Sequence, residues 1–361
     1  MASKTTSSFF FLSLLAFLSI PNFVIASNKI TAIFAFGDST IDAGNNNHIN
    51  TLFRGDHLPY GCDFPNHVPT GRFSNGKIST DYLSQILGIK DLLPAFLDPQ
   101  VTDKDLLTGV SFGSGGSGLD SRTVALAKIL DLSSQFELFE QALLRIRRFV
   151  GNEKANDIIH NALFVISIGT NDMLFNVYML PTSTVTPYGS ISSYQDFLLQ
   201  NLQNFMQRLY GAGGRRITVA GLPPIGCLPI QVTFDSILPS QNWLQRVCNV
   251  QQNIDSQNYN GKLQSNVHLL QATLQDAKVA YFDIYTPILD MVLYPAKYGF
   301  GRSLLGCCGT GVLEMGPVCN KDDIICPDPS KYLFWDAVHL TQEGYSVIAK
   351  NGQTLLPYLT S

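Results

Sequence analysis

The sequence predicts an α/β protein in which helices cover both faces of a mostly parallel sheet. Five short apolar runs, each followed by small or turn-forming residues, have the length and composition of strands that are buried on both faces. The stretches between them place apolar residues at helical spacing. Strand and helix therefore alternate, which is the pattern of a three-layer α/β/α sandwich with a five-stranded sheet. The runs are residues 30–36, 109–113, 162–168, 216–221 and 278–284.

Four of these runs are strong strand candidates, and one is weaker. Residues 109–113 contain two glycines, which lower strand propensity. Helical spacing is clearest in two of the intervening stretches. One carries Leu198, Leu202, Phe205 and Leu209, and the other runs from Trp243 through Val250 and Ile254 to Leu274. Residues 60–74 are expected to form a mobile surface loop.

Composition and charge exclude several classes of protein. The chain has 361 residues and a formal net charge of −4, and 14% of its residues are charged, against about 25% in an average soluble protein. No run of Lys and Arg is longer than a pair, so a nucleic-acid partner is not expected. No internal repeat and no long linker divides the chain. We therefore expect a single domain over residues 27–361.

The N-terminus has the features of a secretory signal peptide. Lys4 supplies a positive charge, residues 9–20 are mostly apolar, and Val24-Ile25-Ala26 precede a cleavage site ahead of Ser27. The alternative is a membrane anchor, but a spanning helix needs about 20 apolar residues. No later segment reaches that length. The sequence therefore predicts a signal peptide over residues 1–26, a secreted, extracellular protein, and no stable membrane span.

Seven cysteines agree with an oxidising compartment, and their odd number leaves at least one free thiol. Cys227 is expected to pair with Cys248, and the four cysteines from Cys307 to Cys326 are expected to pair among themselves, which leaves Cys62 free. The adjacent Cys307 and Cys308 should take different partners. Zinc is the alternative for this late cluster, but it contains no C-x2-C pair and no His at ligand spacing. We therefore expect no metal.

The residues that follow the predicted strands carry the chemistry, because ligands in such sheets bind beyond the carboxyl ends of the strands. Asp38-Ser39-Thr40 follow the first run, residues 114–118 follow the second, and Asn171-Asp172 come shortly after the third. Asp336 and His339 stand near the C-terminus. Each of these has a simpler explanation alone: Ser39 as a helix cap, the glycines and Asn171 as turn formers, and His339 as a surface residue.

Together these residues indicate nucleophilic catalysis. Asp336 and His339 are three residues apart, on one turn of helix or in a tight loop, so the carboxylate can orient the imidazole. A distant Ser39 completes a triad that is defined by roles rather than by sequence separation. The side-chain amide of Asn171 and a glycine N–H can stabilise a developing oxyanion.

Four ordered blocks resemble those of the plant GDSL esterase/lipases, a branch of the SGNH hydrolases. They are Phe36-Gly37-Asp38-Ser39-Thr40 with the following 41–47, then residues 109–116, 168–172 and 334–339. The resemblance extends from about Phe34 to about Leu355. It implies an SGNH hydrolase-like, flavodoxin-like fold. Two departures occur: Thr40 stands where the family name has Leu, and Leu340 follows His339 where Pro is common.

The resemblance also implies a role for each matching residue. Ser39 matches the nucleophile, His339 the base and Asp336 its orienting acid. Gly115 and Asn171 match donors of the oxyanion hole, with the N–H of Ser39 as a third donor. The adjacent Gly116 is an alternative to Gly115, because the block alone does not distinguish them.

The function that follows is that of a serine esterase or lipase, which cleaves carboxylic esters through an acyl-enzyme on Ser39 and needs no cofactor. Its partner is a small-molecule or lipid ester. An acyltransferase that uses the same intermediate, as in cutin polymerisation, is one alternative, and a non-catalytic lipid- or carbohydrate-binding protein is another. Apolar residues over 285–300 fit an acyl pocket or, more commonly, a packed helix. The acyl chain length, the alcohol group and the oligomeric state remain open.

Overall fold

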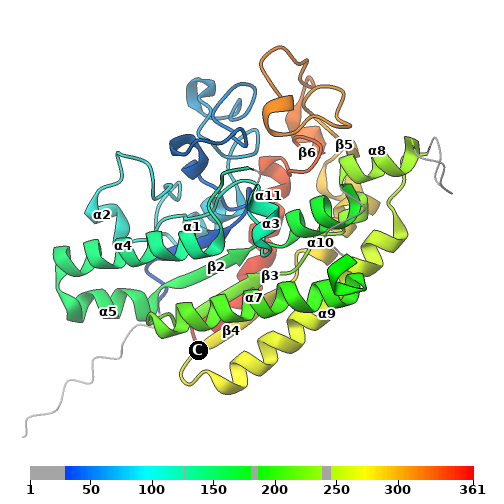
Figure 1. The fold of residues 1–361 in the computed structure, drawn as a ribbon. Coiled ribbons are helices and arrows are strands. Elements are labelled where there is room, and N and C mark those ends of the chain that lie inside the picture. Colours follow the sequence, from blue (N-terminus) through cyan, green and yellow to red (C-terminus); the bar gives the residue numbers. More distant parts are fainter. Residues whose placement is uncertain (1–28, 126, 180–185, 238–244) are drawn as a thin grey trace, which may run out of the picture.

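The computed structural model describes residues 29–361 except 126, 180–185 and 238–244. Four parallel strands form the central sheet in the order β1-β2-β3-β4 (Figure 1). They are β1 (Ile33–Gly37), β2 (Leu163–Ser167), β3 (Arg216–Ala220) and β4 (Lys278–Phe282). Each coincides with one of the strong strand candidates, and the α/β class with a parallel sheet is confirmed.

The fifth predicted strand, residues 109–113, is not a regular strand. The N–H of Ala35 in β1 donates to the carbonyl of Val110 (3.1 Å), and Phe112 donates back to Ala35 (2.8 Å). Gly109 has φ +90°, and a Cβ there would lie 1.9 Å from the carbonyl oxygen of Ile33. Glycine permits this close approach, but the backbone leaves the extended conformation. The segment thus occupies the edge beside β1, and counting it gives the flavodoxin-like order 2-1-3-4-5.

Side-chain caps determine where several of the long helices begin. Asp131 accepts a hydrogen bond from Ser134 N at the start of α4 (Leu132–Val150), and Ser190 accepts one from Ser193 N at α7 (Ile191–Gly211). Asn249 caps α9 (Val250–Thr273), and Thr341 caps α11 (Gln342–Gly352). The remaining α-helices are α1 (Ser79–Ile86), α2 (Asp103–Leu106), α3 (Ser121–Ala125), α5 (Asn152–Asn161), α6 (Thr170–Met173), α8 (Pro229–Ile237), α10 (Tyr285–Leu293) and α12 (Leu356–Leu359).

Of the two helical stretches expected from the sequence, the first is confirmed and the second begins later than predicted. Leu198, Leu202, Phe205 and Leu209 are all buried on α7, as predicted. The second prediction was wrong at its start, because α9 begins only at Val250, which is 68% exposed, and Ile254 is 41% exposed. The disulfide at Cys248 ties the preceding residues to Cys227 instead of letting them continue a helix. Trp243 lies outside the described residues.

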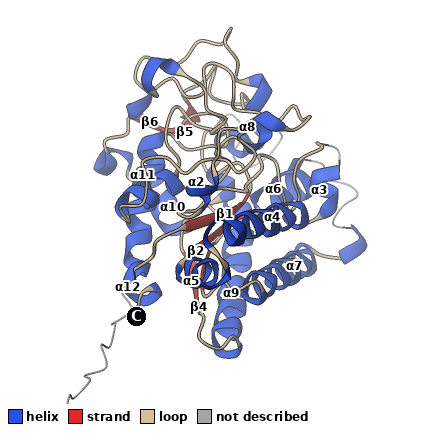
Figure 2. Cartoon of the chain, turned by 90° about the vertical axis from the view of Figure 1, so that its left-hand side faces the viewer, coloured by secondary structure: helices blue, strands red, loops and turns tan. Residues whose placement is uncertain are grey.

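The strands bury side chains on both faces, which makes the three-layer sandwich. On one face Phe34 and Phe36 contact Phe139 of α4 and Phe205 of α7, with ring centroids 5.4–5.8 Å apart. On the other face Ile33 packs in a cluster with residues of α1 and α12. Figure 2 shows α4 and α7 on one side of the strands and α11 and α12 on the other. Within the described parts of the chain, no helix is long and apolar enough to cross a membrane.

A second, two-stranded sheet was not expected from the sequence. It pairs β5 (Arg302–Gly306) with β6 (Tyr332–Phe334). Disulfides Cys307–Cys326 and Cys308–Cys319 close the loop between these strands. The third disulfide, Cys227–Cys248, joins the segment after β3 to the residues before α9. The expected pairings are therefore confirmed, and Cys62 is free. Trp335 and Asp336 follow directly after β6, so the small sheet fixes the start of the segment that carries Asp336.

Candidate active site

The predicted site residues meet at the carboxyl edge of the central sheet. Ser39 lies two residues after β1, and Asn171 lies in α6 shortly after β2. Gly116 belongs to the turn that follows the edge segment beside β1. Because the strands are parallel and paired in register, their carboxyl ends share one edge. His339 and Asp336 reach the same place from the loop between β6 and α11.

Ser39, His339 and Asp336 form a continuous hydrogen-bonded chain. The Oγ of Ser39 lies 2.7 Å from Nε2 of His339, and Nδ1 of His339 lies 2.7 Å from Oδ2 of Asp336. Ser39 and His339 are each only 7% exposed. The other carboxylate oxygen, Oδ1, accepts the N–H groups of Val338 (2.8 Å) and His339 (2.7 Å). Asp336 therefore shapes a tight loop and orients the imidazole at the same time.

The structure does not support the simpler explanation of Ser39 as a helix cap. Residues 38–41 form a turn and not the start of a helix, and Oδ1 of Asp38 accepts both the N–H (3.0 Å) and the hydroxyl (2.8 Å) of Thr40 there. Burial raises the pKa of Asp38 to about 6, and these two hydrogen bonds oppose the rise. The hydroxyl of Ser39 is consequently left to His339.

The two neighbouring glycines differ in what their N–H groups contact. The N–H of Gly115 donates to Oδ2 of Asp42 (2.9 Å), so it is already engaged. Gly116 has φ +86° and lines the same cavity as Ser39, Asn171 and His339. Within the described chain, no hydrogen-bond acceptor is found for the N–H of Gly116 or of Ser39. The geometry therefore favours Gly116 over the predicted Gly115 as an oxyanion donor.

Asn171 is held in place by the loop that carries these glycines. Its Nδ2 donates to the carbonyl oxygen of Ser117 (2.8 Å), and the residue is 8% exposed. Next to it, Asp172 accepts hydrogen bonds from the N–H groups of Leu119 (2.8 Å) and Asp120 (2.9 Å). One amide proton of Asn171 is thus used for orientation, which leaves the other for a ligand.

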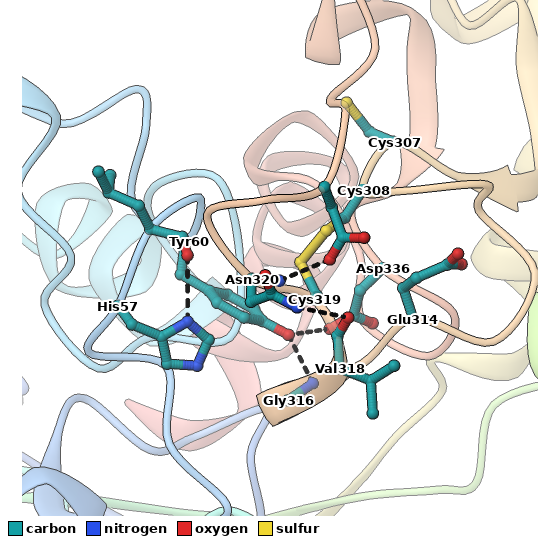
Figure 3. Close-up of a disulfide and its surroundings, with 12 residues drawn as sticks. His57, Tyr60, Cys307, Cys308, Glu314, Gly316, Val318, Cys319, Asn320 and Asp336 are labelled. Atoms are coloured by element: carbon teal, nitrogen blue, oxygen red, sulfur yellow. Dashed lines mark hydrogen bonds between the residues drawn. A yellow bond between two sulfur atoms is a disulfide. The ribbon is translucent and has the colours of Figure 1, made fainter.

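Tyr60 is a site residue that sequence reasoning missed. Its hydroxyl donates to Oδ2 of Asp336 (2.8 Å), the oxygen that also faces His339, and accepts the N–H of Gly316 (2.7 Å) (Figure 3). Burial, and next the charge of Asp336, raise the pKa of Tyr60 well above its usual value, so the hydroxyl keeps its proton. The expected surface loop 60–74 is exposed in its middle, but Tyr60 and Phe73 are buried.

The hydroxyl of Ser39 opens into a mainly apolar cavity of about 210 Å³, which we call the site cavity. One wall is formed by the loop that the Cys308–Cys319 disulfide closes, through Leu313 and residues 315–318. Phe53 and Phe175, whose ring centroids are 6.5 Å apart, also line the cavity. The polar side chains that line the cavity are those of Ser39, Asn171 and His339. A reactive hydroxyl beside an apolar space suits an acyl group better than a charged ligand.

A serine hydroxyl hydrogen-bonded to a histidine–aspartate pair, beside an apolar cavity on an α/β sheet, is the arrangement typical of serine hydrolases. Comparison with known proteins makes this more specific. Residues 33–351 match the family described as GDSL-like Lipase/Acylhydrolase. A GDSL esterase/lipase of Arabidopsis thaliana is 51% identical over 347 residues, which are 96% of this chain and 95% of the relative. Two others from the same plant are 45% and 46% identical over 88% of this chain and 87% of each relative.

The chain therefore belongs to the GDSL lipase/acylhydrolase family. The resemblance that the four sequence blocks carry is confirmed, and the matched region agrees closely with the expected extent from about Phe34 to about Leu355.

Proposed function

We propose that this protein hydrolyses carboxylic esters through an acyl-enzyme on Ser39. The hydrogen-bonded chain from Ser39 through His339 to Asp336 is the observation that carries the proposal. The names of the Arabidopsis relatives, GDSL esterase/lipase, support the same reaction class. No step of this reaction requires a metal or a cofactor.

In the proposed reaction, Oγ of Ser39 attacks the ester carbonyl while Nε2 of His339 takes its proton. The carbonyl oxygen becomes an oxyanion, which the N–H groups of Ser39 and Gly116 and the amide of Asn171 stabilise. His339 then returns the proton to the leaving alcohol oxygen, and the carbon–oxygen bond breaks. Water, deprotonated by His339, then attacks the carbonyl carbon of the acyl-enzyme. The bond between this carbon and Oγ of Ser39 breaks, His339 returns the proton to Oγ, and the acid is released.

A serine-reactive phosphonate tests the nucleophile directly. The wild-type protein should be labelled at Ser39, and labelling should slow when a p-nitrophenyl ester competes for the site. Peptide mapping by mass spectrometry locates the label. A protein that binds lipids or carbohydrates without catalysis would remain unlabelled, and this outcome would remove the proposal.

Hydrolysis and acyl transfer share the acyl-enzyme and differ only in what attacks it. We propose hydrolysis because the family relatives carry esterase and lipase names. With a glycerol ester as substrate, the ratio of free acid to transferred acyl product measures the partition. A predominance of transferred product would assign the acyltransferase alternative instead.

We infer that Tyr60 positions Asp336, since its hydroxyl donates to the oxygen that faces His339. Hydrogen bonds to charged groups contribute about 1.5–3 kcal/mol, so Tyr60→Phe should lower kcat about tenfold to a hundredfold with little change in KM. Steady-state kinetics on a soluble ester measures both constants.

Tyr332→Phe is a matched control, because Tyr332 packs in the same aromatic and cysteine cluster and its hydroxyl makes no hydrogen bond within the described residues. It should leave kcat near the wild-type value. If Tyr60→Phe raised KM and left kcat unchanged, Tyr60 would act through Gly316 and the cavity wall rather than through Asp336.

We also infer that the protein is secreted. The predicted signal peptide lies outside the described residues, and the three disulfides support an oxidising compartment. Under non-reducing conditions, mass spectrometry of the secreted protein should find an N-terminus at Ser27 and one alkylatable thiol, Cys62. An intact Met1, or three or more alkylatable thiols, would contradict secretion through this route.

A further inference from the structure

A second apolar hollow, of about 90 Å³, lies beside the site cavity. It lies between the carboxyl ends of β2 and β3 and the helices α10 and α11, and we call it the α10–α11 groove. None of the residues that line it is charged. Its walls include Thr40, Val165, Ile284, Ile288, Leu340 and Ile348. For residues 285–300, the sequence favoured a packed helix over an acyl pocket. Helix α10 is packed, since Ile288, Met291 and Val292 are buried. Ile288 also lines the groove.

The α10–α11 groove lies next to the residues of the proposed reaction. Thr40 is the chain neighbour of Ser39, and Thr170 is the neighbour of Asn171, and both line the groove. Val338 lines both the groove and the site cavity. Thr40, Thr170 and Val338 are partly exposed. The two apolar spaces therefore adjoin at Val338, the chain neighbour of His339.

We propose that the α10–α11 groove binds the alcohol arm of the ester, while the acyl arm lies in the site cavity. The inference rests on the proposed function. In the tetrahedral intermediate, the reacting carbon carries Oγ of Ser39, the oxyanion, the acyl arm and the alcohol oxygen. The oxyanion faces Gly116 and Asn171, which line the site cavity and do not line the groove.

The position of His339 determines where the alcohol arm lies. Its Nε2 must come within hydrogen-bond distance of the alcohol oxygen in order to protonate it. The residues on both sides of His339, Val338 and Leu340, line the α10–α11 groove. An alkyl chain that leaves the alcohol oxygen therefore passes along Val338 into the groove.

The chemistry of the two spaces identifies the substrate class. Because the groove is uncharged and largely apolar, it favours alkyl alcohols over sugars or charged alcohols. The substrate is therefore an ester that is apolar on both sides of the ester bond. Each methylene that enters the groove should raise kcat/KM about threefold to fourfold until the groove is filled.

Two series of esters separate the arms: alkyl butyrates from methyl to hexyl, and ethyl esters of acids of increasing length. Ile284→Asn places an amide in the groove at a half-buried position before α10. It should lower the ratio of kcat/KM for hexyl to methyl butyrate about tenfold. Leu293→Asn is the matched control at the other end of α10. Leu293 is 57% exposed and does not line the groove, so this variant should keep the wild-type ratio.

Ile288→Phe provides a second variant, which fills the α10–α11 groove with a larger apolar side chain and should shorten the preferred alcohol arm. An unchanged hexyl-to-methyl ratio in both variants would overturn the inference. So would a change confined to the acid series, because the groove would then hold the acyl arm. Failure of the proposed function looks different: no ester would be turned over by the wild-type protein, or turnover would persist in Ser39→Ala.

Discussion

Replacement of Ser39 by alanine should lower ester turnover by several powers of ten. The substitution removes the only oxygen that lies at hydrogen-bond distance from Nε2 of His339 within the described residues, so no acyl-enzyme can form. Binding and oxyanion stabilisation alone leave a residual rate of about 10³ to 10⁴ over the uncatalysed reaction. Turnover of a p-nitrophenyl ester, measured at high enzyme concentration, gives the size of the loss.

Ser265→Ala, at an exposed position on α9, controls for loss of a hydroxyl elsewhere and should retain the wild-type rate. The thermal unfolding midpoint of Ser39→Ala should stay close to that of the wild type, since Ser39 accepts no backbone hydrogen bond in the described structure. Near wild-type turnover in a folded Ser39→Ala protein would remove the assignment of the nucleophile and of the triad.

Asn171→Ala should lower kcat about 100-fold to 1000-fold, with a much smaller change in KM. A donor that meets the oxyanion, which exists only in the transition state and the intermediate, stabilises those states and not the bound substrate. Asn171 is oriented for this role by its bond to the carbonyl of Ser117. Steady-state kinetics on one soluble ester separates the two constants.

Asn171→Asp tests the donor with almost no change in shape. Aspartate cannot donate from an ionised carboxylate, so it should lose at least as much kcat as the alanine variant. Asn204→Ala, at an exposed position on α7, should behave as the wild type. If either Asn171 variant raised KM alone, Asn171 would bind substrate in its ground state and would not belong to the oxyanion hole.

Much of the fold could be predicted from the sequence, because parallel strands buried on both faces must be continuously apolar. That requirement makes β1 to β4 visible as short runs. The edge segment 109–113 was misjudged as a strand, because pattern alone does not show that Gly109 approaches Ile33 too closely for regular pairing. The small β5–β6 sheet was missed, because its strands are short and only partly apolar: β6 has 3 residues, and in β5 only Leu304 and Leu305 are large apolar side chains.

By itself, the sequence determined the reaction class and the triad candidates. Ser39, Asn171, Asp336 and His339 follow predicted strands or lie in one short motif, and the four ordered blocks indicate the family. The pairing of Cys227 with Cys248 and the grouping of the four late cysteines were also predicted, whereas the partners within that group came from the tertiary structure.

Only the tertiary structure distinguishes the two glycines, because it shows that Asp42 already engages the N–H of Gly115, and our proposal of Gly116 as the donor rests on this contact. Only the tertiary structure identified Tyr60, whose partner Asp336 is 276 residues away. The α10–α11 groove likewise exists only where residues from several distant elements leave space between them. The local sequence pattern indicates which residues are buried and where the chain turns. Which N–H group a carboxylate engages, and what shape a cavity has, depend on contacts between segments that are remote in sequence.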